Sequence, residues 1–364
     1  MYLLDEISSF LREDLGLHQG LSGLQPLAQW VQPTAFRVFL ESDSALRSLI
    51  VKHIPDSGGS SLADLWQPRW KIAQDYINLC FLQEICAGAF APQVHGYSEE
   101  RNMLAIQDLG GTSLWEIENI PALATHNGVW REVARALGRL VACCPPDPER
   151  FQSFARAKRP DFTPLRKWQD QDPNAYHSIV SIAREMDFGH VPELEAEVAR
   201  LVALTTEANR WVAYSVGDLW PQHVMFHEGC VKFIDFHCGG YDIATTDLMR
   251  LVDGSPLYRD RPLPQEIITD CKDAFFAELS GARDGHLDCQ EFEEVYDFTL
   301  VRHVVFMVAR EVLQLRRVHL CDLVTKAVRA ARLRLESTEH ARAITMEFLA
   351  ELEELPNKRL NGTR

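Results

Sequence analysis

The sequence predicts an α+β protein of two lobes, a small strand-rich lobe followed by a larger, mostly helical one. Short runs with alternating apolar residues dominate the first hundred positions, and runs with helical spacing dominate the rest. The length of 364 residues also exceeds the size that one hydrophobic core usually serves. We place the lobes at residues 1–110 and 111–364.

The first lobe is expected to open with an amphipathic helix over residues 2–15. The runs GLQPLAQW and AFRVFLES predict two strands around a turn at residues 31–34, and SLIVKHIP predicts a third. A flexible loop, DSGGSS, follows. Apolar spacing then predicts a helix over residues 69–86, and NMLAIQDLGG is typical of a strand that ends at a glycine break.

The second lobe is expected to be helical from about residue 112. One apolar stripe starts at Trp130 and ends before Pro145-Pro146, and a further helix is expected from Pro192 to about Ala208. Long helical stretches follow to about residue 354, including 301–315 and 323–335. The stretch 145–176 carries basic residues that indicate a solvated face more than an anion site, namely Arg156, Lys158, Arg159, Arg166 and Lys167.

Composition excludes several function classes. The net charge of −15, from 37 basic and 52 acidic residues, argues against nucleic-acid partners and against docking on an anionic membrane. The negative charge favours solubility, and it would also favour binding of a cationic substrate. Even the apolar run around Arg302 and His303 is too short and too interrupted to span a membrane.

The cysteines indicate a reducing compartment. Nine of them are scattered without regular spacing, and Cys143 and Cys144 are adjacent, which is unfavourable for a bridge. The opening residues MYLLDEISSF lack the basic segment of a secretory signal. We therefore expect a cytoplasmic protein.

The run from Trp211 to Leu248 carries the chemistry. Asp218 follows one apolar segment, His223 lies five residues on, and Asp235 closes the next apolar run, VKFID. Phosphoryl transfer needs such a set, because one group must orient or deprotonate a hydroxyl and others must hold metal ions against the phosphates. A hairpin with incidental acids at its turns is the alternative interpretation of any one of these residues.

This run resembles the catalytic core of the aminoglycoside phosphotransferase and choline kinase branch of the kinase-like fold. The family pattern is HGD, four residues, Asn, a strand ending in IDF, and a later Asp before an apolar helix. The resemblance covers most of residues 20–255. The matching residues are Gly217, Asp218 and Leu219, then Ile234, Asp235 and Phe236, then Asp247 and Leu248.

Two departures from the family pattern stand out. Val216 replaces the usual His, and His223 replaces the usual metal-binding Asn. Lipopolysaccharide core kinases are similar to this chain at the second departure, and they also follow Ile-Asp with a His, as His237 does here. The segment Asp-Leu-Trp-Pro, which begins at Asp218, is similar to the corresponding segment of fructosamine kinases.

The resemblance implies an ATP-dependent phosphotransferase that uses Mg²⁺, with Mn²⁺ as an alternative ion, and phosphorylates a hydroxyl of a small molecule. The acceptor would be an aminoglycoside-like antibiotic, a sugar or an amino alcohol. Asp218 would be the catalytic base, Asp235 the principal metal ligand and His223 an accessory ligand. Asp247 would brace the catalytic loop.

The resemblance also assigns the nucleotide site to the first lobe. Lys52, within the third strand, would hold the phosphates, and Asp75 on the next helix would orient it as an ion pair. Glu84 is the other candidate for that partner. The segment Gln107, Asp108 and Leu109 is similar to the family's interlobe hinge, whose backbone bonds the adenine.

Two alternatives stay open at this point, and a zinc site is set aside. The chain could be a degraded kinase-like protein that binds nucleotide without catalysis, because of Val216, His223 and a first turn that lacks glycine. It could be a lipopolysaccharide-type sugar kinase. A zinc site at His223, His227 and Cys230 lacks a matching second pair of ligands. The sequence fixes neither the acceptor nor the oligomeric state.

Overall fold

The computed structural model describes residues 2–18, 20–27, 35–41, 46–54, 68–120, 127–161, 173–206, 210–254, 263–283, 287–308, 321–336 and 343–362. Its Cα atoms gather into two compact units that interleave along the sequence. The first unit combines residues 1–124, 148–165 and 216–240, and the second combines 125–147, 166–215 and 241–364. The lobe boundary at residue 110 stays a prediction.

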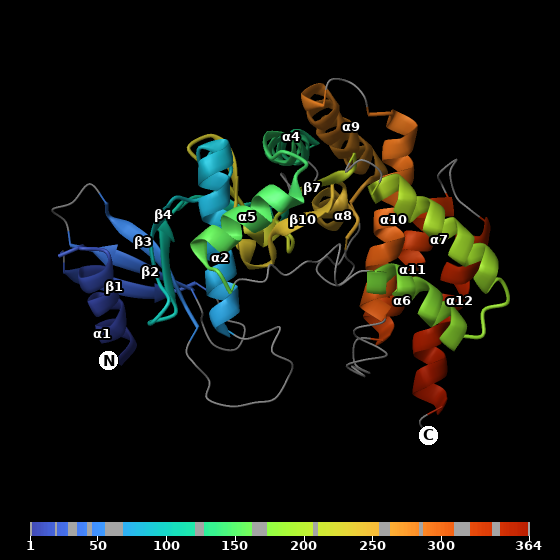
Figure 1. The fold of residues 1–364 in the computed structure, drawn as a ribbon, viewed down its shortest axis with the longest axis horizontal. Helices are drawn as coiled ribbons and strands as arrows, with labels where there is room; N and C mark the ends of the chain where they lie inside the picture. The colour runs from blue at the N-terminus through green and yellow to red at the C-terminus, as the bar shows by residue number, and fades with distance from the viewer. Residues whose placement is uncertain are drawn as a thin grey trace. The chain divides into compact units, whose positions relative to one another are not determined.

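The first unit is built on a five-stranded antiparallel sheet in the order β1-β2-β3-β5-β4 (Figure 1). The strands are β1 (Leu21–Pro26), β2 (Ala35–Leu40), β3 (Ser48–His53), β4 (Val94–Ser98) and β5 (Met103–Gln107).

One face of this sheet packs against the N-terminal helix. Helix α1 (Tyr2–Ser9) continues into the π-helical turn η1 (Phe10–Asp14), and both bury apolar side chains in a core with alternate residues of β2, β3 and β5. In β3 those residues are Leu49 and Val51. Because successive strand residues point to opposite faces, Lys52 faces away from this core.

Helix α2 (Pro68–Cys86) joins β3 to β4 and contacts β4, β5 and the short turn η5 (Phe236–Cys238). Helix α5 (Pro148–Lys158) packs on α2, where the Phe81 and Phe151 rings meet edge to face at 5.0 Å. The buried Gln74, Asp75 and Asn78 of α2 supply polar groups to the site.

A second small sheet, in the order β6-β8-β9, completes the first unit. Ser113 begins helix α3 with a capping box, in which its side chain and that of Glu116 each accept from the other's backbone N–H. The elements are β6 (Thr112–Ser113), α3 (Leu114–Glu118), the 3₁₀ turn η4 (Pro221–His223), β8 (Val224–His227) and β9 (Cys230–Phe233).

The second unit is mainly helical and contains one two-stranded sheet, β10-β7. Helix α4 packs against α9, and Gly138 lies at that contact, where a Cβ atom would stand 2.8 Å from the Phe275 carbonyl oxygen. The elements are α4 (Asn127–Cys143), α6 (Pro173–Glu185), α7 (Val191–Thr206), β7 (Val212–Ser215), β10 (Gly240–Ile243), α8 (Thr246–Val252), α9 (Gln265–Ala282), α10 (Cys289–Met307), α11 (Cys321–Glu336) and α12 (Ala343–Gly362).

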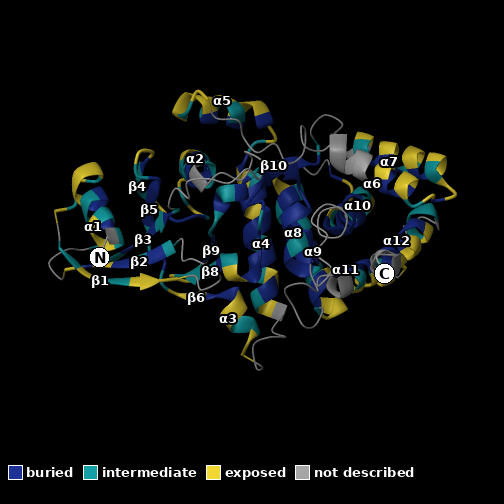
Figure 2. Cartoon of the chain, turned by 90° about the horizontal axis from the view of Figure 1, so that it is seen from below, coloured by how far each residue is buried: buried dark blue, intermediate teal, exposed yellow. Residues whose placement is uncertain are grey.

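Helix α7 shows how the helices of the second unit are patterned. Leu194, Val198 and Leu201 are buried at helical spacing, and most residues between them are exposed (Figure 2). Arg302 of α10 is also buried, because its guanidinium pairs with both oxygens of Asp242. Across the described ranges, no helix combines the length and the apolar character that crossing a membrane requires.

The predicted α+β fold class is confirmed: a strand-rich region with a five-stranded antiparallel sheet precedes a mostly helical one. The expected helices over residues 2–15 and 69–86 are present, as are the first three strands, each ending earlier than predicted. Strand β4 and helix α5 were missed. The turn at 31–34, the loop DSGGSS, residues 309–315, and Arg166 and Lys167 lie outside the described residues.

Candidate active site

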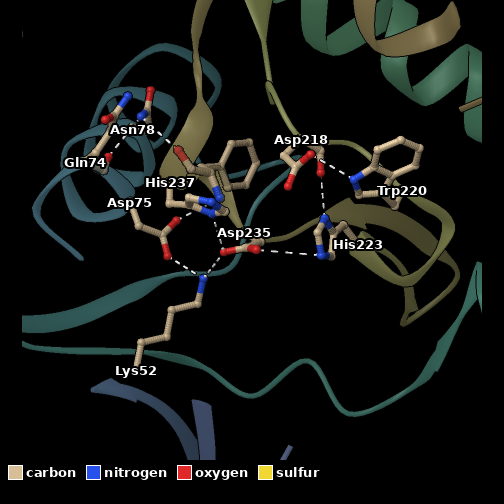
Figure 3. A network of polar contacts seen from close by, with 10 residues as sticks. Lys52, Gln74, Asp75, Asn78, Asp218, Trp220, His223, Asp235 and His237 are labelled. Atoms are coloured by element: carbon tan, nitrogen blue, oxygen red, sulfur yellow. Dashed lines mark hydrogen bonds and ion pairs between the residues drawn. The ribbon is translucent and has the colours of Figure 1, made fainter. Parts of the chain in front are cut away.

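Lys52 is the centre of a charged network in the first unit (Figure 3). Its Nζ atom lies 2.5 Å from Oδ2 of Asp75 and 2.8 Å from Oδ1 of Asp235. Burial alone would lower the pKa of Lys52, but the two carboxylates outweigh it and raise that pKa above its ordinary value. The amine therefore stays charged across the physiological range.

Asp75 links this lysine to the following turn. Oδ2 bonds Lys52, and Oδ1 accepts the backbone N–H of Phe236 at 2.9 Å. The side chain is only 1% exposed, so both oxygens are satisfied within the protein. Glu84, the other candidate partner, is an exposed residue, and the pairing between Lys52 and Asp75 is the one that the structure contains.

Asp235 lies between strand β9 and the turn η5. Its backbone is left-handed, with φ 66° and ψ 61°, a conformation that costs a non-glycine residue about 1–3 kcal/mol and persists only where the surrounding structure imposes it. Two buried amides of α2 hold the turn that follows. Asn78 Nδ2 donates to the carbonyl oxygens of Phe236 (3.0 Å) and Gly239 (3.3 Å), and Gln74 Nε2 donates to that of Gly239 (3.2 Å).

His237 on this turn completes the charge balance around Asp235. Its Nδ1 lies 3.0 Å from Asp235 Oδ1. Burial would lower the pKa of His237, but Asp235, aided by the Cys238 sulfur, raises it to about 10. Burial likewise opposes ionisation of Asp235, yet Lys52 and then His237 keep its pKa well below its ordinary value.

Asp218 lies in the loop after β7 and is oriented by two local contacts. The indole Nε1 of Trp220 donates to its Oδ1 at 2.8 Å, and Nδ1 of His223 lies 2.7 Å from its backbone oxygen. A carbonyl oxygen only accepts hydrogen bonds, so Nδ1 of His223 carries the hydrogen. Gly217, at the start of this loop, takes a positive φ of 90°, a backbone conformation that would be strained in a residue with a side chain.

The same tautomer bears on metal binding. With Nδ1 protonated, Nε2 of neutral His223 presents a lone pair, and it lies 3.7 Å from Oδ2 of Asp235. An imidazole nitrogen and a carboxylate oxygen at that separation fit a shared divalent ion. The oxygen suits Mg²⁺, and the nitrogen suits Mn²⁺ or a softer ion better.

The segment predicted to bind adenine is tied into the sheet by its side chains. The Asp108 carboxylate accepts from Arg37 (2.7 Å), Ser48 (2.8 Å) and the Gly110 N–H (2.9 Å). Burial would raise the pKa of Asp108, but these donors, Arg37 first, lower it. Any nucleotide contact from this residue would therefore come from its backbone.

Gln107 and Leu109, on either side of Asp108, both meet His227 of β8. Nδ1 of His227 donates to the Leu109 carbonyl oxygen, and its Nε2 lies 3.5 Å from the Gln107 amide nitrogen. His227 therefore braces this segment, an arrangement different from the zinc site that sequence spacing raised.

Asp247 belongs to the second unit, at the start of α8. Its Oδ1 accepts from the Ser215 hydroxyl at 3.0 Å, and the side chain is 2% exposed. Ser215 is the last residue of β7 and directly precedes the segment that carries Asp218. The bracing role of Asp247 stays a prediction.

The structure thus brings Lys52, Asp75 and Asp235 into direct contact, and His223 contacts both the Asp218 backbone and Asp235. Sequence reasoning assigned no role to Gln74, Asn78, Trp220 and His237. Two of them stood in segments that the sequence analysis noted: Trp220 in Asp-Leu-Trp-Pro, and His237 after Ile-Asp-Phe. The catalytic and binding roles of all these residues stay predictions.

Residues 35–282 match the profile of a protein family described as "APH: Phosphotransferase enzyme family". The matched range includes every residue of the network in Figure 3. The comparison with curated proteins gave no match.

Solved structures resemble the chain over nearly its whole length. A choline/ethanolamine kinase family protein from Mesorhizobium loti is 13% identical with a TM-score of 0.52, covering 96% of this chain and 98% of that one. The ADP-bound aminoglycoside phosphotransferase APH(2'')-Ib is 12% identical with a TM-score of 0.51 (89% and 98%). Choline kinase from Cryptosporidium parvum Iowa II is 12% identical with a TM-score of 0.50 (98% and 97%). At these identities the likeness concerns the fold.

Proposed function

The chain belongs to the phosphotransferase enzyme family, and on that premise we propose that it transfers the γ-phosphoryl group of ATP to a hydroxyl of a small molecule. The acceptor is an aminoglycoside-like antibiotic, a sugar or an amino alcohol. The nine cysteines without regular spacing suit a reducing compartment, so the proposal places the reaction in the cytoplasm.

The observation that carries this proposal is the network of Lys52, Asp75 and Asp235 (Figure 3). Catalysis of phosphoryl transfer depends mostly on positioning and on charge stabilisation. A lysine held charged between a buried acid and a second, partly exposed acid supplies a phosphate-binding cation beside a metal-binding carboxylate. A core without this chemistry would have little reason to bury such a set.

On the donor side, Lys52 would bind the phosphate oxygens while Asp75 keeps its amine in place. The backbone of residues 107–109 would hold the adenine. Asp235, with Nε2 of His223, would hold the divalent ion, Mg²⁺ or Mn²⁺, which neutralises phosphate charge during transfer.

On the acceptor side, Asp218 would orient the substrate hydroxyl and accept its proton. The hydroxyl oxygen forms a bond to the γ-phosphorus as the bond from that phosphorus to the β-γ bridging oxygen breaks, releasing ADP. The hydrogen bond from Trp220 to Oδ1 fixes the rotamer of Asp218, and we assign the transferred proton to its other oxygen, Oδ2.

A second candidate function is nucleotide binding without transfer. It is favoured by the contacts of Asp235, whose Oδ1 meets both Lys52 and His237 in this structure. In that function the acid would serve only as a counter-ion. A lipopolysaccharide-type sugar kinase is the third candidate, and association of the protein with a membrane would favour it.

The decisive experiment incubates purified protein with ATP, Mg²⁺ or Mn²⁺, and a panel of hydroxylated metabolites and antibiotics. Mass spectrometry should detect an acceptor that gains about 80 daltons, the mass of one transferred phosphoryl group. The Asp218→Asn variant is the control. Binding of ATP without any acceptor or water receiving phosphate, over the whole panel, would favour the second candidate.

A further inference from the structure

One peptide unit in the segment after β5 is held at both of its polar ends. The carbonyl oxygen of Leu109 accepts from Nδ1–H of His227. The N–H at the other end of the same peptide, that of Gly110, donates to Oδ1 of Asp108 at 2.9 Å. The two restraints come from different elements, because His227 ends strand β8 and Asp108 directly follows β5. Side chains on both sides therefore fix the orientation of this peptide.

The backbone around this peptide would otherwise permit it to turn over. Gly110 has φ 55°, and glycine adopts both this left-handed conformation and the one that a reversed peptide requires. The next residue is confined by packing, because a Cβ atom on Gly111 would stand 2.2 Å from the Phe226 carbonyl oxygen of β8. The chain is thus permissive at Gly110, and the direction of the peptide depends on His227 and Asp108.

His227 is arranged to donate from Nδ1. A carbonyl oxygen only accepts, so Nδ1 carries the hydrogen and Nε2 of the neutral ring has the lone pair. That Nε2 lies 3.5 Å from the amide nitrogen of Gln107, which is a donor. The Gln107 amide is itself oriented, because its oxygen accepts the backbone N–H of Gln93 at 3.3 Å. Strand β8 pairs with β6 and with β9, so the backbone that carries His227 is also held in place.

The two purine bases differ in polarity at the edge that a peptide backbone can recognise. Adenine offers the N6–H donor beside the acceptor N1, whereas guanine offers the acceptor O6 beside its N1–H and N2–H donors. Guanine therefore needs carbonyl acceptors for two kinds of donor, and a carbonyl oxygen that already accepts from His227 is a poorer acceptor for either. A buried N–H of the base that stays without a partner lowers affinity by about 10- to 100-fold.

We propose that His227 is a specificity-determining residue of the nucleotide site: by engaging the Leu109 carbonyl oxygen, it makes the site select adenine nucleotides over guanine nucleotides. This inference rests on the proposed function, in which the backbone of residues 107–109 holds the base. His227 acts through the peptide that joins Leu109 to Gly110, so it is a positioning residue. Its loss should change the choice of base more than the overall affinity for nucleotide.

The test measures the affinity of the full-length protein for ADP and for GDP, each with Mg²⁺, by isothermal titration without an acceptor. The parent should bind ADP at least about 10-fold more tightly than GDP. His227→Ala removes the donor to the Leu109 carbonyl oxygen, so this ratio should fall to about 3-fold or less. His227→Asn should restore the parent's ratio, because the amide N–H of asparagine lies close to the position of Nδ1.

Cys230→Ser is the matched control, because Cys230 is exposed and lies opposite His227 in the register of β8 and β9. It should keep the parent's ratio, and melting temperatures establish that all variants are folded. Equal affinities of the parent for the two nucleotides overturn the inference. So does a His227→Ala variant that loses affinity for both by the same factor, since that marks a merely structural role. Preference for ADP that depends on His227, in a protein that transfers no phosphate, supports the inference and contradicts only the transfer proposed above.

Discussion

Lys52 and Asp75 form a 2.5 Å ion pair between strand β3 and helix α2, and the second oxygen of the same carboxylate accepts the backbone N–H that follows Asp235. One buried acid thus positions both the proposed phosphate-binding amine and the turn that bears the proposed metal ligand. Loss of this acid should disturb two functions together.

The first prediction concerns nucleotide binding. Lys52→Ala should lower kcat/KM for ATP by about 10- to 100-fold, because hydrogen bonds to charged groups contribute about 1.5–3 kcal/mol. Asp75→Asn should have a similar effect, and Glu84→Gln, at an exposed position on the same helix, should have none. Steady-state kinetics over a range of ATP concentrations measure this. Normal kinetics and normal melting of Lys52→Ala would remove Lys52 from the site.

The second prediction concerns Asn78 as a positioning residue. Asn78→Ala removes the donor to the Phe236 and Gly239 carbonyl oxygens, so the turn should hold Asp235 less firmly. The Mg²⁺ concentration for half-maximal activity should rise severalfold, and the free energy of unfolding should fall by about 1–3 kcal/mol. Asn119→Ala, an exposed asparagine that bonds a helix carbonyl, is the control. A stability loss with an unchanged Mg²⁺ requirement would make Asn78 purely structural.

The sequence predicted the fold well where periodicity carries the information. The run SLIVKHIP predicted a strand that contains Lys52, and β3 is that strand, with Leu49 and Val51 on its core face and Lys52 on the other. The order of expected strands followed by expected helices predicted the α+β fold class. Strand β4 was missed because VHGYS is short and contains a glycine, which weakens a strand pattern.

The site was predicted less completely, and the reason is distance along the chain. Asn78 and the Phe236 carbonyl it bonds are separated by 158 residues, and no local pattern marks an amide whose partner is so remote. Local patterns did mark Asp218, His223 and Asp235, because the family's motif spacing holds them. The tautomer of His223 depends on its contact with the Asp218 carbonyl oxygen and required coordinates.

The third prediction concerns acid stability in the second unit. Burial alone would raise the pKa of Asp242, but the paired Arg302 outweighs burial and lowers it. A carboxyl with a depressed folded-state pKa contributes stability above its unfolded pKa of about 3.9, and that contribution is lost as pH falls toward the folded-state value. Asp242→Asn leaves Arg302 buried without its charge partner and should cost about 3–5 kcal/mol near neutral pH.

Urea unfolding at several pH values checks this. The variant should also lose less stability than the parent between about pH 4 and lower values, because the titrating carboxylate is gone. Asp161→Asn removes an acid that pairs with Arg159 in an exposed setting and should change little. Equal unfolding curves for the two variants would show that the buried pair contributes no more than a surface one.

The fourth prediction concerns the ion preference set by His223. An imidazole nitrogen near Oδ2 of Asp235 favours Mn²⁺ over Mg²⁺ more than an amide oxygen would. The parent should therefore show higher activity with Mn²⁺, and His223→Asn should shift the preference toward Mg²⁺. Asparagine keeps an N–H that can bond the Asp218 carbonyl oxygen, so the loop contact is conserved. An identical preference in both proteins would restrict His223 to supporting the loop.

The last prediction concerns Asp218. General-base assistance contributes about 10²- to 10⁴-fold to turnover, so Asp218→Asn should lower kcat by about that factor while ATP binding persists. The substitution keeps an oxygen that can accept from Trp220 Nε1, so the loop geometry is retained and only the charge is lost. Asp235→Asn should instead weaken metal-dependent ATP binding as well, because that carboxylate contacts Lys52 and lies near His223.

Comparing these two variants on an identified acceptor separates chemistry from binding. Isothermal titration with a non-hydrolysable ATP analogue gives the affinity, and single-turnover kinetics give the rate of transfer. Because the transition state of phosphoryl transfer is loose, the base mainly orients the hydroxyl and does not need to remove its proton early. The loss of kcat in Asp218→Asn should therefore lie toward the lower end of the about 10²- to 10⁴-fold range. Full phosphotransfer by Asp218→Asn would refute the mechanism, since no other described carboxylate is assigned to the acceptor.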